Sequence, residues 1–351
     1  MIVVIPSNRS VDLGHLAPLI DSGARFVVVD DSEGSIRIDH PRFRVFDWGD
    51  RRRLLGDHER AIPRRNGACR DLGFVVAWKE ADDDEIIVAL DDDCVVEEAD
   101  FAARVERVLS RDPRPEARVD GVHLNIIDCY RNVPDRVFPR GFPYSARPGY
   151  TRCRFVPGAA GDVAFSLGLW REVFDVNAID KIQGPGFSFP DAALHFESVL
   201  VPPGKLVSVC SMNMHFRRSV IPAVYQLPMH VEVMPNWVID RYGDIWGGFI
   251  LKTLLDKRGE SMAAGGPMIR HLKDGNVQRN TWQEHLCHLV NDEFVDLLRE
   301  SAERFGPASH VDMMAALTEE FARRAEDASP ILGPYLVHLA DAMRSWVAVL
   351  S

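Results

Sequence analysis

The segment 85–94, EIIVALDDDC, is a short apolar run that ends in three consecutive aspartates, Asp91, Asp92 and Asp93. A continuous apolar run of this length predicts a buried strand in a parallel sheet. In open α/β sheets, ligands bind beyond the carboxyl ends of the strands. The three carboxylates are therefore expected at a ligand site.

Adjacent carboxylates repel one another, so folding them together costs free energy unless a cation or hydrogen-bond donors offset the repulsion. Mg²⁺ or Mn²⁺ is the simplest partner, because such ions bind one or two carboxylates and complete their coordination with substrate phosphates and water. The segment thus predicts metal-assisted binding of a diphosphate. The alternative is a solvated acidic turn, which is our interpretation of Asp82–Asp84 just before the apolar run.

The bulk properties narrow the class of protein. The chain has 351 residues, enough for one elaborated domain or two, and a formal net charge of −11. This charge argues against a nucleic-acid partner, which needs a basic face. The six cysteines show neither a CxxC pair nor zinc-ligand spacing, as is typical of reduced thiols. With no signal-peptide pattern or bilayer-length apolar stretch, a cytoplasmic protein without membrane attachment is expected.

Strand-like and helix-like patterns alternate from the start of the chain, with strands at 2–5, 25–31 and 43–46 and helices at 13–20 and about 66–79. This alternation predicts an α/β fold with a Rossmann-like sheet and helices on its faces. No GxGxxG fingerprint follows the first strand and no GxxxxGK[ST] loop occurs, which argues against dehydrogenases and P-loop enzymes.

Polar side chains near the ends of the first strands are candidates for nucleotide binding. Asp31 is placed to bond a ribose or base, and the polar run after the first strand has similar reach. Helix capping and loop hydrogen bonding explain each of them equally well. Arg65 and Arg70 are expected to face the phosphates, although a solvated helix charge explains one of them equally well. Besides Asp31, the candidates for nucleotide binding are Ser7, Asn8, Arg9, Arg65 and Arg70.

Several blocks resemble, in the same order, the plant reversibly glycosylated polypeptides, which are UDP-arabinopyranose mutases. They are GACR at 67–70 with Gly73, DDDC at 91–94, RGFPYSAR at 140–147, GLW at 168–170, MNM at 212–214 and YGDIW at 242–246. Their shared order is more specific than any single motif. The resemblance implies a GT-A glycosyltransferase-like fold for residues 1–290. Residues 291–351 lie outside it and are interpreted as a helical C-terminal extension for packing or homodimerisation. In this extension Ser309 and Asp312 are placed to cap the start of a helix, and Pro330 and Pro334 are expected to break it.

The resemblance also implies a reaction and the residues that take part in it. The family binds a nucleotide sugar with Mn²⁺ or Mg²⁺ and interconverts pyranose and furanose forms of the sugar. By resemblance, Asp91 and Asp93 belong to the metal motif and His271 completes metal binding, while Asp91 and Asp92 also face the nucleotide. A hydrogen-bonded loop or core histidine is an equally good interpretation of His271 by itself.

Arg147 matches the arginine that becomes glycosylated in the plant proteins. A plain electrostatic clamp on the diphosphate is the simpler hypothesis, because a protonated guanidinium is a poor nucleophile. Asp244 is the candidate acid or base. The plant pattern has an acidic residue where this chain has Gly243, which leaves the sugar open. The matching blocks add three candidates for substrate contact or shielding, Trp170, Asn213 and Trp246. For the two tryptophans, a place in the hydrophobic core is the favoured alternative.

The leading hypothesis is a mutase that interconverts pyranose and furanose forms of a UDP- or GDP-linked sugar. A glycosyltransferase with a separate acceptor is an alternative, because the same sites serve both reactions. A self-glycosylating protein is another, and stoichiometric rather than catalytic turnover would identify it. The many Arg and Ala residues favour a bacterial source, where such a mutase would serve antibiotic or surface-sugar synthesis.

Overall fold

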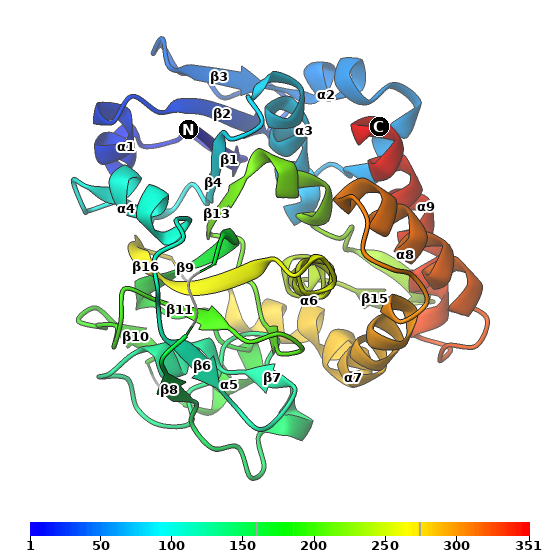
Figure 1. The fold of residues 1–351 in the computed structure, drawn as a ribbon. Helices are drawn as coiled ribbons and strands as arrows, with labels where there is room; N and C mark the ends of the chain where they lie inside the picture. Colours follow the sequence, from blue (N-terminus) through cyan, green and yellow to red (C-terminus); the bar gives the residue numbers. More distant parts are fainter. Residues whose placement is uncertain (159–160, 185, 274) are drawn as a thin grey trace.

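Residues 2–90 build a parallel four-stranded unit (Figure 1). The computed structural model describes residues 1–158, 161–184, 186–273 and 275–351. Strands β1 (Ile2–Ser7), β2 (Arg25–Asp30), β3 (Phe43–Phe46) and β4 (Ile86–Leu90) lie in the order β3-β2-β1-β4, and each neighbouring pair is parallel. Their apolar runs are buried because the sheet is covered on both faces.

Helical segments connect these strands. The predicted helix at 13–20 is a 3-10 turn, η1 (Leu13–Leu16), that continues into α1 (Ala17–Asp21), and the helix predicted at about 66–79 is η3 (Gly67–Arg70) followed by α3 (Asp71–Glu80). Between β3 and η3 lie α2 (Trp48–Leu55) and η2 (Gly56–Ala61). The Rossmann-like half predicted from the sequence is confirmed.

Beyond β4 the sheet changes direction. Strand β13 (Asn213–Arg217) is antiparallel to β4 and to β9 (Val163–Val173), and β9 is parallel to β16 (Ser261–His271). The sheet then ends with β11 (Ser198–Val201), β6 (Glu116–Arg118) and β8 (Arg154–Val156). The predicted α/β class is confirmed, and the sheet has a parallel first half and a mixed second half. The aspartates lie at the carboxyl end of β4, where the two halves meet.

One pairing in the second half positions a candidate ligand. The end of β16 pairs antiparallel with β5 (Cys94–Val95), with Arg270 opposite Val95 and His271 opposite Cys94. His271 is thereby brought beside the aspartate triplet.

The other elements are short apart from α6. They are α4 (Phe101–Val108), β7 (His123–Leu124), η4 (Ile126–Cys129), η5 (Tyr144–Ala146), α5 (Ala178–Gln183), β10 (Ser188–Phe189), β12 (Leu206–Val207), η6 (Arg218–Ala223), β14 (Val231–Met234), β15 (Trp237–Ile239) and α6 (Gly243–Arg258).

The C-terminal part is helical, as predicted, with α7 (Val277–Ala302), α8 (His310–Arg324) and α9 (Leu332–Leu350). Ser309 caps α8 by accepting the Asp312 N–H at 3.1 Å, which confirms the predicted cap. Pro334 was expected to break the helix but lies in the first turn of α9, where a missing N–H costs no hydrogen bond.

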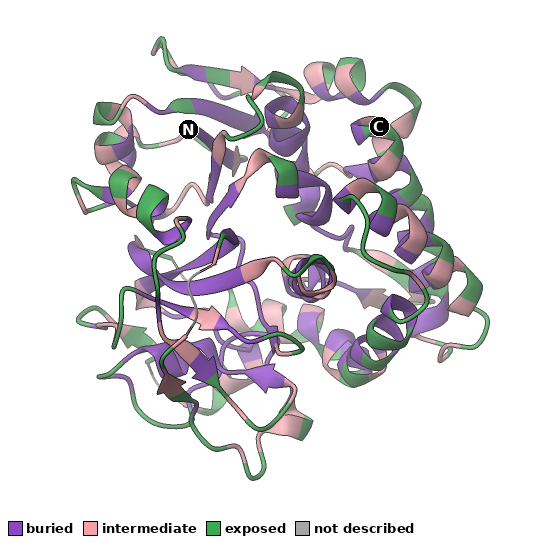
Figure 2. Cartoon of the chain, in the orientation of Figure 1, coloured by how far each residue is buried: buried purple, intermediate pink, exposed green. Residues whose placement is uncertain are grey.

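The helical tail packs on the sheet-bearing part of the chain. The boundary expected at 290/291 falls inside α7. In α9, the Trp346 ring stacks on Tyr225 at 4.9 Å and its Nε1 donates to the Pro222 carbonyl at 3.0 Å. The inward faces of these helices are buried (Figure 2) and join the same hydrophobic core as the sheet. Within the described ranges, no helix has the length and apolar character needed to cross a lipid bilayer.

Gly73 lies where α3 touches the sheet. A Cβ at this position would lie 2.3 Å from Val4 Cγ1 and 3.3 Å from Val29 Cγ2. We expect Gly73→Ala to lower the free energy of unfolding by about 1–3 kcal/mol, because overpacking forces the helix away from β1. Urea denaturation measures this change. Gly121→Ala is the matched control, since nothing lies within 4 Å of its Cβ. Equal stability of the two variants would contradict the close contact.

Candidate active site

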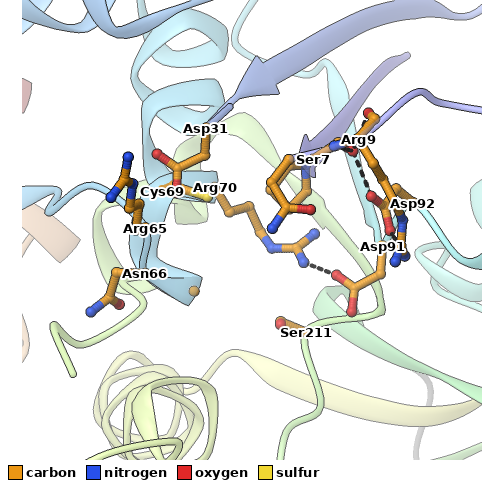
Figure 3. Close-up of a pocket in the computed structure, with 13 residues that line it drawn as sticks. Ser7, Arg9, Asp31, Arg65, Asn66, Cys69, Arg70, Asp91, Asp92 and Ser211 are labelled. Atoms are coloured by element: carbon orange, nitrogen blue, oxygen red, sulfur yellow. Dashed lines mark hydrogen bonds and ion pairs between the residues drawn. The ribbon is translucent and has the colours of Figure 1, made fainter. Parts of the chain in front are cut away.

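Two cavities lie beside each other at the carboxyl ends of β1 and β4. The larger one has a volume of about 780 Å³ and the smaller one about 330 Å³. Arg9, Asp91 and Ser211 line both, so the cavities share a wall. Of the residues predicted from the sequence, the larger cavity is lined by Ser7, Asn8, Arg9, Asp31, Arg65, Arg70, Asp91 and Asp92 (Figure 3). The smaller is lined by Arg9, Asp91, Asp93, Asp244 and His271.

Two arginines hold the aspartate triplet. Arg70 is buried, donates to the Leu90 carbonyl at 3.0 Å and pairs with Asp91 (Figure 3). Arg9 pairs with Asp92 and lies 3.2 Å from Asp93 Oδ2. The repulsion inferred from the sequence is therefore offset by guanidinium groups.

The same region keeps donors that a ligand can use. Ser7 Oγ lies 2.5 Å from Asp92 Oδ2 and accepts the Arg9 backbone N–H at 3.1 Å, which fixes the turn after β1. Arg70 Nε is buried with no hydrogen-bond partner among the described residues. The positive charge of Arg9 and Arg70, which both line this end of the cavity, favours an anionic ligand there.

Asp93 and His271 form the pair best suited to a divalent ion. His271 Nδ1 lies 2.8 Å from the Val173 carbonyl, so this nitrogen carries the proton and donates. Nε2 is then left with its lone pair, and it lies 3.9 Å from Asp93 Oδ1. Burial, followed by the charge of Asp91, raises the pKa of Asp93. A cation between the two side chains would offset both effects.

The donor set fits Mg²⁺ or Mn²⁺ held by two protein ligands, with phosphate oxygens and water completing the coordination. The predicted third ligand, Asp91, instead pairs with Arg70. In the ranges that the structure describes, no three His, Cys, Asp or Glu side chains are grouped closely enough to hold a metal by themselves.

Arg140 is the central residue of the smaller cavity, and the sequence analysis did not select it. Its Nε donates to both Asp175 oxygens at 3.0 Å, and one terminal nitrogen donates to Asp244 Oδ2 at 2.6 Å. Asp244 lies in the first turn of α6. The position of its carboxylate is therefore set by a buried arginine. No local signal identifies this pairing, because Arg140 and Asp244 are 104 residues apart in the chain.

Arg147 lies outside the residues that line the two cavities. Its guanidinium forms a double hydrogen bond with Asp180 of α5, at 2.9 and 2.8 Å. The same group lies over the rings of Tyr144, at 3.9 Å, and Phe138, at 4.8 Å. This arrangement anchors the 140–147 loop to α5.

Trp170, Asn213 and Trp246 also lie away from both cavities, which differs from the expected contact with substrate. All three are fully buried. Asn213 Nδ2 donates to the carbonyls of Leu169 at 3.1 Å and Pro267 at 3.0 Å, joining β13 to the neighbouring strands. Trp246 Nε1 donates to an amide oxygen of α7 at 3.0 Å. These motif residues serve core packing, because all three are fully buried. The polar groups of Asn213 and Trp246 are bonded inside the protein, whereas Trp170 Nε1 has no hydrogen-bond partner among the described residues.

Helix α7 contributes to the smaller cavity through Asn280 and Glu284. Glu284 accepts the Ala178 N–H at 2.8 Å and Arg241 Nε at 3.2 Å. Burial alone would raise the pKa of Glu284, but the imidazole of His288 at 3.8 Å, the charge of Arg140 and the Ala178 N–H outweigh burial and lower this pKa. Neither residue was predicted to line a site, because the sequence of α7 shows only an amphipathic pattern. Lys181 and Lys273 also line this cavity.

Asp175 gives the site a testable pH dependence. Burial by itself would raise its pKa, but the Arg140 guanidinium outweighs burial and lowers it to about 2. The stabilisation is thus present above the usual value of 3.8 and is lost as the pH falls through about 2. We expect Asp175 to account for about 2 kcal/mol of the stability lost in this range.

Urea denaturation at several pH values between 5 and 2 measures this contribution. The free energy of unfolding is plotted against pH for the wild type and for Asp175→Asn, and the slopes of the two plots are compared. Asparagine has no proton to gain, so the variant should lose stability less steeply on acidification. Parallel profiles would contradict the assignment.

Known proteins show similarity along the whole chain. The family model described as "Reversibly glycosylated polypeptide" matches residues 2–351. "Probable UDP-arabinopyranose mutase 4" from Arabidopsis thaliana is 28% identical over 98% of this chain and 88% of its own length. "UDP-arabinopyranose mutase 1" from Oryza sativa subsp. japonica is 25% identical over the same shares. The expectation that the resemblance stops near residue 290 is wrong, since the family match includes the helical tail.

Among solved structures, a mannosyltransferase from Pyrobaculum calidifontis, in complex with GDP-Man and Mn²⁺, aligns with 99% of this chain and 83% of its own. The TM-score is 0.36 and the sequence identity is 12%.

Proposed function

The chain belongs to the reversibly glycosylated polypeptide family, and from this premise we propose that it is a metal-dependent nucleotide-sugar mutase. It would interconvert the pyranose and furanose forms of a UDP- or GDP-linked sugar. Curated relatives named UDP-arabinopyranose mutase support the reaction class. The observation that carries the proposal is the pair of cavities with a common wall at Arg9, Asp91 and Ser211.

The larger cavity is proposed to hold the nucleotide. Its volume of about 780 Å³ is sufficient for a nucleoside diphosphate. Arg9 and Arg70 are proposed to face the phosphates, and Asp31 and Arg65 the nucleoside. Asp93 and His271 would hold the divalent ion, which when bound neutralises charge on the diphosphate leaving group.

The smaller cavity is proposed to hold the sugar. Cleavage of the bond between the anomeric carbon and the diphosphate leaves positive character on the sugar, which nearby carboxylates stabilise. Asp244, held by Arg140, is the candidate to bind a sugar hydroxyl or move its proton. A different sugar hydroxyl then bonds to the anomeric carbon and gives up its proton, while the bond from that carbon to the former ring oxygen breaks and this oxygen takes up a proton. The diphosphate then recombines with the anomeric carbon of the new ring. The sugar must be shielded from water during this cycle, because hydrolysis would consume it.

The test is incubation of the purified protein with Mn²⁺ and a panel of UDP- and GDP-linked pyranoses without acceptor. Chromatography and NMR would follow the nucleotide sugars, and intact mass the protein. We expect a furanose isomer formed over many turnovers, and its identity would name the base and sugar. Recovery of all the nucleotide sugars unchanged would contradict the proposal and favour a transferase that needs an acceptor. One sugar per protein chain would favour self-glycosylation. A role in surface-sugar or antibiotic synthesis is the corresponding proposal for the pathway.

A further inference from the structure

Trp48 contacts two residues of the larger cavity. It is the first residue of α2 and follows the capping residue Asp47. Its indole Nε1 donates to Asp31 Oδ1 at 2.8 Å. The guanidinium carbons of Arg64 and Arg65 lie 4.6 and 5.4 Å from the centre of its ring. The Trp48 side chain thus joins Asp31 to Arg65, both of which line the cavity.

These contacts lie at one end of the cavity. Asp31 and Arg65 occupy one side and Arg9 and Asp92 the other, with Arg70 between them (Figure 3). The phosphates belong beside Arg9 and Arg70, because these two guanidinium groups line the cavity next to the aspartates. The opposite end is then left for the nucleoside. A carboxylate beside a guanidinium offers acceptors and donors to the polar edge of a base and to ribose hydroxyls.

The backbone at Arg65 needs support. Its φ of 52° lies in the left-handed region, which non-glycine residues seldom adopt. Burial raises the pKa of Asp31, and the Trp48 indole together with the backbone N–H groups of Arg65 and Asn66 opposes that rise. The Asp31 carboxylate therefore joins the end of β2, the start of α2 and the turn at residues 65–66.

We propose that Trp48 is a positioning residue for the nucleobase end of the cavity. Its N–H fixes the Asp31 carboxylate and its ring supports the Arg65 guanidinium, so that both groups are oriented before the nucleotide arrives. The inference rests on the proposed function, because it takes the larger cavity as the nucleotide site.

Two substitutions separate the two contacts. Trp48→Phe keeps an aromatic ring beside the arginines but removes the N–H donor to Asp31. Trp48→Ala removes both. We expect Trp48→Phe to weaken UDP or GDP binding about 3- to 10-fold, and Trp48→Ala about 30-fold. In turnover, KM should rise while kcat is retained, because the reacting atoms lie at the other end.

Isothermal titration calorimetry of the full chain with UDP, GDP and inorganic pyrophosphate, each with Mg²⁺, tests the proposal. Pyrophosphate lacks a base, so its affinity should be unchanged in both variants. Trp237→Phe is the matched control, since Trp237 is 43% exposed on β15 and does not line the cavity. Thermal melting would be recorded for each variant.

Unchanged nucleotide affinity in Trp48→Ala would overturn the inference. So would an equal loss of pyrophosphate affinity, because it would indicate general damage to the site. A wild type that binds pyrophosphate but neither nucleotide would overturn the proposed function and this inference together. If the wild type binds a nucleotide and Trp48→Ala binds it with equal affinity, this inference alone is overturned and the proposed function stands.

Discussion

Asp93→Asn is expected to lower kcat for sugar rearrangement about 10³-fold while the protein keeps its fold. Asp93 lies 3.9 Å from His271 Nε2, and this pair fits a divalent ion better than any other described pair at the cavities. A neutral amide binds Mg²⁺ or Mn²⁺ weakly, so the diphosphate charge would not be neutralised during bond cleavage. Removing one carboxylate also relieves its repulsion with Asp91, which should preserve stability.

The measurement is turnover of the identified nucleotide sugar, together with Mn²⁺ binding followed by electron paramagnetic resonance and with thermal melting. Asp84→Asn is the matched control, because Asp84 lies in the exposed acidic turn before β4. It should behave as the wild type does. Wild-type turnover and Mn²⁺ affinity in Asp93→Asn would refute the proposed metal pair.

Arg140→Met is expected to lower the free energy of unfolding by about 3–5 kcal/mol and to abolish activity. The substitution leaves Asp175 and Asp244 largely buried without their shared cation. Arg140 is 8% exposed, and both carboxylates lie within 3.0 Å of its nitrogens. Because burial opposes the charged state of each carboxylate, removing the guanidinium costs more than loss of a surface ion pair.

Urea denaturation of a double-mutant cycle isolates this interaction. Adding Asp175→Asn to Arg140→Met should recover part of the lost stability, because it removes one unpaired charge. Arg140→Lys keeps the charge without the forked geometry and should be intermediate. Arg111→Gln is the control: it breaks an exposed ion pair with Asp162 and should leave the free energy of unfolding unchanged. Additive effects in the cycle would contradict the proposed coupling.

Several features could be predicted from the sequence because they depend on neighbouring residues. The alternation of strand-like and helix-like segments predicted the parallel half of the sheet. An apolar run followed by aspartates predicted the end of β4. The cap of α8 could be predicted because it involves only Ser309 and Asp312, three residues further along the chain. The order of the motif blocks was sufficient to identify the family.

The roles of individual side chains depended on contacts between distant segments. His271 lies beside Asp93 only because β16 pairs with β5. Arg140 and Arg147 have the same side chain in one motif, yet one lines a cavity and the other pairs with Asp180 outside it. Trp170 and Trp246 are core residues because strands and helices from elsewhere cover them.

The sequence by itself therefore determined the fold class, the place of the aspartates and the family, since short-range patterns of polarity set helices, strands and motifs. The tertiary structure decided which charges pair, which aromatic residues are buried and that α7 contributes to the site. These outcomes arise from packing between distant segments, such as those of Arg140 and Asp244, which are 104 residues apart, and no local pattern contains that information.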